Sequence, residues 1–470
     1  RRLWKATFLF WNDCWPPHRN PASRHSVEKM SGDSPVPGHR QTQFPTAPSD
    51  RENTSCARSV HRIPLWHDWH THPMLYSAFL EAIDLQQIDR SPQEVRKAIA
   101  DKASTAPGAW TIAYGWDPHA IPLETLALDR IPHPVVLLHR SLHGVAINRA
   151  GRPWLEKRDP QAASSIDDPH WVEENLRRVL NLFVLPGASS DRLRNFYQRM
   201  AMEHGIWQAD EMLLVDPDEL RLFEEAGLSD RSLFWAAPET FQAMPHHQQK
   251  QVDGLKIFAD GAIGTRTAAL HPPYLDSSPP QRGQLLLTAQ QIAHYAIMAT
   301  QSQKPLAIHA IGDRAIDVVI DAESRVRVLD IHPSLRIEHA QLISQPAAHR
   351  AKALGIHLCM QPNFSSDSVD YQDRLPRELV ERNNDFRMLI DSAGYRPGFD
   401  LFFGSDGMPH GAKSALSQSL FPPLASQKLS LEEFQLGYCH PDLTPGWIDL
   451  AIDWTRQLVE TAPTIRQQAR

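Results

Sequence analysis

The chain has 470 residues, a length that predicts either two domains or one large barrel with additions. Hydrophobic residues make up 41% of it and charged residues 22%, so the composition is that of an ordinary globular protein. The formal charge of -7 gives no electrostatic reason to expect nucleic acid or an anionic membrane as a partner.

The cysteines and the apolar runs indicate the compartment. Four cysteines, Cys14, Cys56, Cys359 and Cys439, are widely spaced and form no CxxC pair. They predict neither a disulfide framework nor a thiolate zinc site, and a reducing, cytoplasmic location is therefore expected. No apolar run approaches the roughly 18 residues that a membrane span requires.

The first plausible buried strand ends in a pair of histidines. Residues 1–62 are rich in Pro, Ser, Arg, His and Gln without any period, which predicts a loosely ordered extension. A strand then leads into Asp68, His70 and His72, whose side chains share one face because alternate residues of a strand point the same way. Two imidazoles at a strand end can bind one divalent ion. A pair alone is a weak signal, because the chain contains 24 histidines.

The next region mixes helices with short strands and predicts an insertion at about residues 105–200. The expected helices are residues 74–85, 91–104, 171–183 and 190–204, and the expected strands are residues 110–117 and 134–139. An insertion at this place separates the first barrel strand from the second.

From residue 206 onward, short apolar strands alternate with amphipathic helices such as residues 288–300 and 314–325. The expected strands are residues 206–210, 233–237, 255–259, 306–310, 335–340, 356–361 and 401–405. With the strand before His70 they make eight. Eight strands separated mainly by helices predict a (β/α)8 TIM-type barrel of the α/β class over residues 63–440.

Polar residues lie at the ends of several predicted strands. Lys256 lies in the fourth strand, His309 and His339 close the fifth and the sixth, and Asp406 follows the eighth. The carboxyl ends of barrel strands converge on one face, so these residues and the His70 pair are expected in one ring of ligands. Taken singly, the lysine could be ion-paired, the histidines hydrogen-bonded in the interior, and Asp406 a helix cap. Possible metal ligands at five strands, 1, 4, 5, 6 and 8, together favour a metal site over five separate structural roles.

The order His-x-His, Lys, His, His, Asp on these strands resembles the amidohydrolase superfamily. Two phrases resemble its family-three branch, which includes enzymes similar to N-substituted formamide deformylase. They are Lys-Ile-Phe-Ala-Asp-Gly at residues 256–261 and His-Ala-Ile-Gly-Asp-Arg-Ala at residues 309–315. Arg-Ile-Glu-His-Ala-Gln at residues 336–341 and Gly-Ser-Asp at residues 404–406 add to it. The resemblance covers roughly residues 63–439.

The resemblance implies a metal-dependent hydrolase that cleaves an amide-type, non-peptide carbon-nitrogen bond by attack of metal-bound hydroxide. His70, His72 and Asp406 would hold one divalent ion, most simply zinc, and His309 and His339 a second. Lys256 would bridge the two ions as a carbamate, because an unmodified lysine ammonium only donates hydrogen bonds. Asp406 would also move the proton as the catalytic residue.

Two alternatives stay open at this point. In a single-metal, deaminase-type hydrolase, His70, His72, His309 and Asp406 would bind one ion while His339 polarises the substrate. In a reading from a different class, the chain is a catalytically inactive barrel or a binding protein.

Members of the resembled branch carry a Gly-Trp-Asp phrase and a later His in the insertion, which Trp116 and His143 match. His143 is therefore expected to contact a small-molecule substrate, with a surface-loop histidine as the alternative. Superfamily members often pair, so the resemblance is compatible with a homodimer, while the sequence itself leaves the oligomeric state open.

The resembled proteins also have a companion β-sandwich, which this chain is expected to lack or to keep in reduced form. Residues 1–60 show no convincing strands, and residues 447–460 predict a helix within a C-terminal helical tail at residues 441–470.

Overall fold

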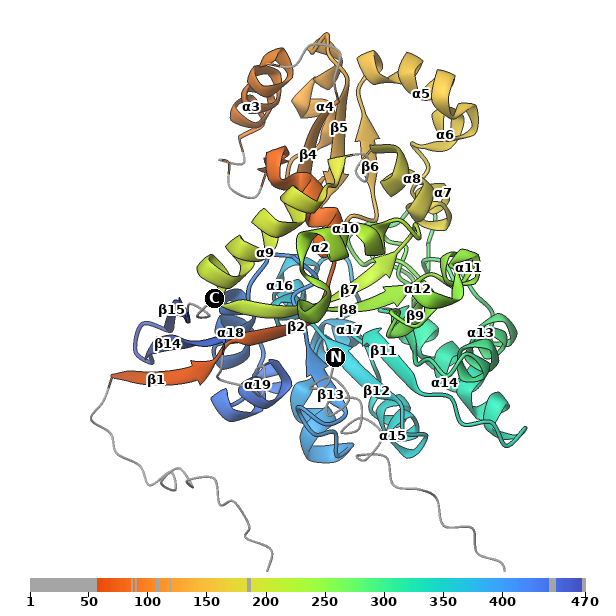
Figure 1. Cartoon of the computed structure of the whole chain (residues 1–470), viewed down its shortest axis with the longest axis vertical. Helices are drawn as coiled ribbons and strands as arrows, with labels where there is room; N and C mark the ends of the chain where they lie inside the picture. Colours follow the sequence, from red (N-terminus) through yellow and green to blue (C-terminus); the bar gives the residue numbers. More distant parts are fainter. Residues whose placement is uncertain are drawn as a thin grey trace, which may run out of the picture. The chain divides into compact units, whose positions relative to one another are not determined.

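Eight parallel strands form the central sheet of the protein (Figure 1). The computed structural model describes residues 57–85, 88, 91–105, 110–118, 120–183, 187–438 and 445–466. In spatial order the strands are β2 (Trp66–Thr71), β7 (Ile206–Leu214), β8 (Ser232–Ala236), β9 (Gly254–Phe258), β10 (Leu306–Ala310), β11 (Leu335–His339), β12 (His357–Met360) and β13 (Leu401–Phe403). The predicted (β/α)8 barrel is confirmed.

The barrel is nearly closed between its last strand and its first. Just after β13, the backbone N–H of Asp406 donates to the carbonyl of His70 at 2.7 Å, and the N–H of Ser405 donates to the Asp68 carboxylate at 2.8 Å. Gly404 permits this approach, since a Cβ atom there would lie 2.4 Å from the backbone nitrogen of His70. The seam therefore fixes Asp406 beside the histidine pair.

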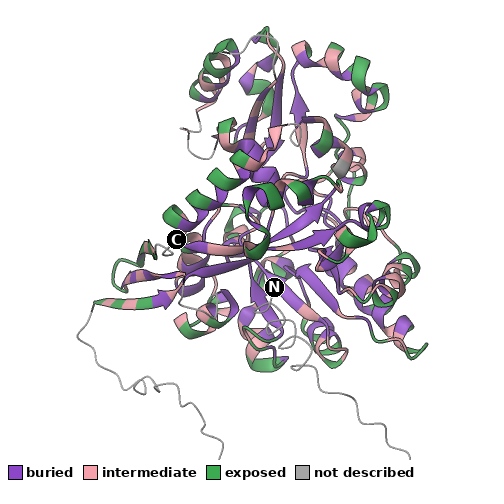
Figure 2. Cartoon of the chain, viewed as in Figure 1, coloured by how far each residue is buried: buried purple, intermediate pink, exposed green. Residues whose placement is uncertain are grey.

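The strands are buried on both faces, which explains their continuous apolar runs (Figure 2). Every residue of β10 and β11 is buried. Helix α13 (Ala289–Gln301) begins at a Thr288 capping box, and α14 (Asp313–Arg327) buries apolar residues at three-to-four spacing. The other helices around the strands are α2 (Pro73–Ala78), α9 (Ser190–His204), α10 (Glu219–Ala226), α11 (Pro238–Ala243), α12 (His246–Gln249), α15 (Gln345–Ala353), α16 (Asp367–Asp370), α17 (Arg377–Arg382), α18 (Ala412–Leu420) and α19 (Leu431–Tyr438).

The predicted insertion has a sheet and an apolar core of its own. Its four strands are β3 (Ile83–Asp84), β4 (Thr111–Trp116), β5 (Val135–His139) and β6 (Val145–Ile147), of which the first three are parallel. Its helices are α3 (Pro92–Thr105), α4 (Leu123–Leu126), α5 (Arg152–Arg158), α6 (Pro160–Ser165), α7 (Pro169–Glu174) and α8 (Leu176–Phe183). It begins near residue 83, earlier than expected, because β3 pairs with β4. The single helix expected at residues 171–183 is divided into α7 and α8.

The prediction of a C-terminal helix was wrong. Strands β14 (Gly446–Asp453) and β15 (Leu458–Ile465) occupy that region and form an antiparallel sheet with β1 (Arg58–Pro64). Ile448, Leu450 and Ile452 are buried alternately with less buried neighbours, a period of two that only a strand can place on one face. Strand β14 pairs with β1, which comes from a distant part of the sequence. The local sequence pattern does not reveal this partner.

Strand β1 also corrects the expectation that residues 1–60 contain no strand and that the extension runs to residue 62. Residues 1–56 of the predicted extension lie outside the described residues. The companion sandwich was expected to be missing or reduced, and in the described part of the chain the segments that flank the barrel form one three-stranded sheet.

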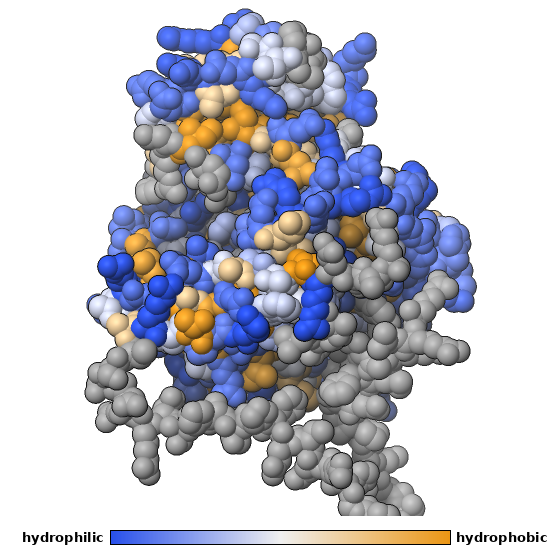
Figure 3. All heavy atoms as spheres, turned by 60° about the vertical axis from the view of Figure 1, so that its left-hand side comes forward, coloured by the Kyte–Doolittle hydropathy of each residue, from blue (hydrophilic) through white to orange (hydrophobic). Residues whose placement is uncertain are grey.

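The described surface is mainly hydrophilic on the face that Figure 3 shows, with apolar residues in smaller groups. Among the described residues, no helix combines the length and the apolar character needed to cross a membrane.

Candidate metal centre

All seven residues singled out in the sequence line one cavity of about 50 Å³. They are His70, His72, His143, Lys256, His309, His339 and Asp406. Six come from the carboxyl ends of barrel strands β2, β9, β10 and β11 or from the turn after β13, and His143 comes from the insertion. The barrel therefore brings together residues that are more than 300 positions apart in the chain.

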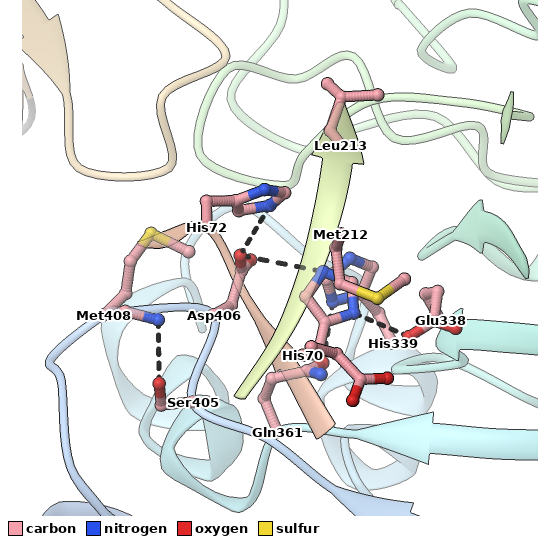
Figure 4. A network of polar contacts seen from close by, with 12 residues as sticks. His70, His72, Met212, Leu213, Glu338, His339, Gln361, Ser405, Asp406 and Met408 are labelled. Atoms are coloured by element: carbon pink, nitrogen blue, oxygen red, sulfur yellow. Dashed lines mark hydrogen bonds and ion pairs between the residues drawn. The ribbon is translucent and has the colours of Figure 1, made fainter. Parts of the chain in front are cut away.

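His70, His72 and Asp406 form a close group of side chains (Figure 4). The Asp406 Oδ1 atom lies 3.7 Å from Nε2 of His70 and 3.4 Å from Nε2 of His72. One ligand atom from each residue lies within 4.8 Å of those of the other two. Two imidazole nitrogens and a carboxylate oxygen at such distances can bind a single divalent ion.

His309 and His339 lie beside this group. The ring centroids of His309 and His339 are 4.5 Å apart, and those of His70 and His339 are 4.7 Å apart. His339 and Asp406 both have a positive φ, 71° and 54°, a backbone conformation that is uncommon outside glycine and often occurs at functional sites. These turns aim both side chains at the shared cavity.

In each of the three buried imidazoles, one ring nitrogen is held by an acceptor. The partner of His70 Nδ1 is the Glu338 carboxylate at 2.6 Å, and that of His339 Nδ1 is the Gln361 amide oxygen at 2.6 Å. The Gly261 carbonyl lies 3.1 Å from His309 Nε2.

These acceptors determine the state of the rings. A carboxylate, an amide oxygen and a carbonyl only accept, so the bonded nitrogen carries the proton and the other nitrogen keeps its lone pair. Burial lowers the pKa of His70, His309 and His339 well below the ordinary value, which keeps the three rings neutral. Neutral rings with a free lone pair are the form that binds a metal.

His72 is in a different electrostatic environment. Burial opposes its positive charge, but hydrogen bonding with Asp406 and Glu211 outweighs burial and raises the pKa of His72 to about 9. The Glu211 Oε1 atom lies 3.8 Å from Nδ1 of the ring. The two carboxylates leave a negative environment that a bound cation would neutralise.

Lys256 is buried, and its Nζ atom has no hydrogen-bond partner among the described residues. The Phe258 ring centroid is 5.2 Å from this nitrogen. Burial lowers the pKa of Lys256 to about 8, although Glu338 and Asp406 raise it. A buried amine without an acceptor is costly, so this atom is the least satisfied part of the centre.

A buried polar network beneath the ligands was not predicted. Glu338 accepts from His70 and also from Arg336 Nε at 2.5 Å, and the Arg336 guanidinium contacts Asp210 at 3.3 Å. The Asp210 carboxylate is also bound by His67 and Trp235. One signal was present in the sequence, because Arg and Glu two positions apart in an apolar strand point together into the barrel.

His143 is buried and is held by a residue that sequence reasoning missed. Its Nδ1 atom lies 2.8 and 2.9 Å from the two carboxylate oxygens of Glu173 in α7, to which Thr267 also donates at 3.0 Å. The His143 ring centroid is 5.2 Å from that of His309. Burial opposes a positive charge on His143, but Glu173 outweighs it and raises the pKa. Trp116 instead donates to the Ile121 carbonyl within the insertion.

A second cavity of about 190 Å³ adjoins the first. The two cavities share Ser141, His143, His309, Asp406 and Met408 as lining residues. Two of the proposed ligands, His309 and Asp406, therefore lie where the smaller and the larger cavity meet.

The sequence model described as "Amidohydrolase family" matches residues 187–411, just under half of the chain. This segment contains strands β7 to β13, and with them Lys256, His309, His339 and Asp406. The comparison thus relates the segment that carries four of the seven site residues to amidohydrolases.

Two relatives match shorter stretches. Protein LONG AFTER FAR-RED 3 of Arabidopsis thaliana is 33% identical over 119 residues, which are 25% of this chain and 20% of that protein. Putative amidohydrolase YtcJ of Bacillus subtilis (strain 168) is 33% identical over 142 residues, 29% of this chain and 26% of that protein. The matches therefore span about a fifth and a quarter of the length of these relatives.

Two solved structures share the fold over most of the chain. An uncharacterized metal-dependent hydrolase from Pyrococcus furiosus aligns with a TM-score of 0.58 and 24% identity, covering 80% of each chain. One from Pyrococcus horikoshii OT3 aligns with a TM-score of 0.58 and 22% identity, covering 80% of this chain and 77% of the other.

Proposed function

We propose that the protein is a metal-dependent hydrolase that cleaves the carbon-nitrogen bond of a small amide-type, non-peptide substrate. The observation that carries the proposal is the convergence on one cavity of five histidines, a carboxylate and a lysine whose Nζ atom has no hydrogen-bond partner among the described residues. A scaffold without chemistry has no need of this set. The amidohydrolase match over residues 187–411 supports the same reaction class.

The donor atoms fit a divalent metal centre. His70, His72 and Asp406 would hold one ion and His309 and His339 a second, with His70, His309 and His339 each binding through the ring nitrogen that its hydrogen bond leaves free. Nitrogen ligands with a carboxylate suit zinc. When bound, such an ion lowers the pKa of water and polarises a substrate carbonyl.

Lys256 would complete this centre as a carbamate. Its neutral amine would add to carbon dioxide, forming one N–C bond and releasing one proton, and the product would be an anion with two oxygen atoms. With a pKa of about 8, Lys256 has a larger fraction of neutral amine at neutral pH than an exposed lysine has. The carbamate would also supply the metal centre with an anionic oxygen ligand, which the neutral imidazoles do not provide.

The side chains of the site then have distinct roles. Burial opposes ionisation of Asp406, but the neighbouring histidines and Lys256 lower its pKa, so that it is a carboxylate at neutral pH. It would accept a proton from the attacking water and deliver it to the leaving nitrogen. His143, oriented by Glu173, would hydrogen-bond the substrate through its other ring nitrogen.

Metal content and amide hydrolysis test the proposal together. Protein purified without chelator is expected to contain up to two equivalents of metal by elemental analysis and to hydrolyse members of a panel of N-formyl and N-acetyl amines. His70→Asn and chelator should abolish both metal binding and turnover, whereas His349→Asn on the exposed face of α15 should change neither. Absence of bound metal, with added zinc failing to bind, would overturn the proposal.

A further inference from the structure

We infer that the larger cavity binds the amine half of the substrate and selects amines that carry an ammonium group in addition to the amide nitrogen. The inference rests on the proposed amide hydrolysis and adds the substrate class. It follows from the charges and the unpartnered acceptors of the larger cavity, compared with the apolar wall of the smaller one.

One cation in the larger cavity is surrounded by carboxylates. Arg140, from the insertion, donates to Asp367 at 3.2 Å and to Asp370 at 3.3 Å, and Asp117 lies 3.7 Å away. The same guanidinium also donates twice to the hydroxyl of Tyr371. Three carboxylates around one guanidinium leave the group negative, so Arg140 is already neutralised and is a poor site for an anion.

A second arginine near this wall is also committed. Arg374 donates to the carbonyl oxygens of Ile263 and Gly264, which line the larger cavity, and to Asp276 at 3.0 Å. Its charge is therefore paired with Asp276 and does not offset the Asp367 carboxylate that lines the cavity.

Two amide side chains that line the larger cavity each have a buried oxygen atom without a donor among the described residues. Asn363 is 5% exposed, and its Oδ1 atom has no hydrogen-bond partner among the described residues. Its Nδ2 atom donates to the carbonyls of Ser405 and Met408, which determines the orientation of the amide. The Oε1 atom of Gln418 is likewise unpartnered within the described part of the chain. Buried acceptors without donors favour a ligand that brings N–H groups.

The smaller cavity has the opposite character. Apart from the site residues, it is lined mainly by apolar side chains, which are Met74, Leu75, Leu142, Leu176, Leu180, Leu213, Val215, Phe258 and Met408. Its volume of about 50 Å³ suits a small apolar acyl group, and its wall offers a charged group few partners. The acyl half of an amide would therefore point into the smaller cavity and the amine half into the larger one.

Three substrates of matched length test this assignment. They are N-acetyl-1,4-diaminobutane, which ends in an ammonium group, N-acetylpentylamine, which ends in a methyl group, and N-acetyl-5-aminopentanoate, which ends in a carboxylate. The metal-loaded protein is expected to show a kcat/KM about tenfold to a hundredfold higher for the first than for the third, the size of a charge-assisted hydrogen bond. Hydrolysis of all three at the same kcat/KM would overturn the inference and leave the proposed function standing.

A variant and a binding measurement separate the two proposals further. Asp367→Asn should lower the ratio of kcat/KM between the cationic and the anionic substrate by about tenfold, while Asp373→Asn, on an exposed side chain of the same loop, should preserve the ratio. Calorimetric titration of the wild-type protein with 1,4-diaminobutane, pentylamine and 4-aminobutyrate needs no turnover. Tighter binding of the diamine supports the inference even if no amide is cleaved, and equal binding of the three overturns it.

Discussion

The barrel and its insertion contribute to the site in different ways. The barrel contributes His70, His309 and His339, which come from strand ends and have one nitrogen held by a buried acceptor. The insertion contributes His143 and Arg140, which extend from a smaller sheet with its own core. Under the proposed function, the barrel would hold the reaction centre, whereas the insertion would shape the space in which a substrate is recognised.

The largest expected effect comes from the barrel side, at Lys256. Lys256→Ala should lower metal content from two equivalents to one and reduce kcat by about a hundredfold or more, because a catalytic ion contributes several kcal/mol. Elemental analysis and steady-state kinetics measure both. Unchanged metal content and turnover would favour the single-metal, deaminase-type site instead.

A smaller effect is expected at Glu338, which binds no substrate but orients His70. Glu338→Gln should weaken metal binding by about tenfold to a hundredfold, the usual range for a residue that orients a metal ligand. Competition with a chelator of known affinity measures the change. Glu323→Gln, which alters a buried carboxylate of α14 away from the cavity, is the matched control. Equal metal affinity in the two variants would contradict the positioning role of Glu338.

On the insertion side, Glu173→Gln should leave metal content intact and lower kcat/KM by about tenfold, since it weakens a charge-assisted hydrogen bond to His143. Kinetics and elemental analysis of the same preparation separate these outcomes. Loss of metal in this variant would break the proposed division between barrel and insertion.

The smallest effect on catalysis is expected in the sheet formed by β1, β14 and β15. Ile448 is fully buried beside Gly205 and Trp66, and Ile448→Ala should lower the free energy of unfolding by about 2–4 kcal/mol. Denaturant titration measures this loss. The kcat and the metal content should stay at wild-type values at temperatures where the variant is folded, and a specific loss of metal would show that this sheet supports the centre.

Much of the barrel and of the candidate ligand set could be predicted from the sequence. Apolar runs of strand length alternate with amphipathic helices, the polar residues His309 and His339 lie at the ends of their strands, and Asp406 follows shortly after its strand. Both signals are local, and the topology of a parallel barrel converts strand ends into neighbours. The residues that orient the ligands were harder to predict from the sequence. Glu338 and Glu173 acquire their roles only through His70 and His143, which lie elsewhere in the chain.

The sequence by itself determined the eight-stranded periodicity and the residue types at the strand ends. Only the tertiary structure decided which nitrogen of each histidine stays free, since Glu338 reaches His70 across 268 positions. It also decided that residues 446–465 are strands, because Ile448 and its neighbours pair with β1 from the opposite end of the chain. The physical reason is the same in both cases. Hydrogen-bond partners and sheet partners that are distant in sequence determine the protonated ring nitrogen and the secondary structure. Local sequence propensity does not identify these partners.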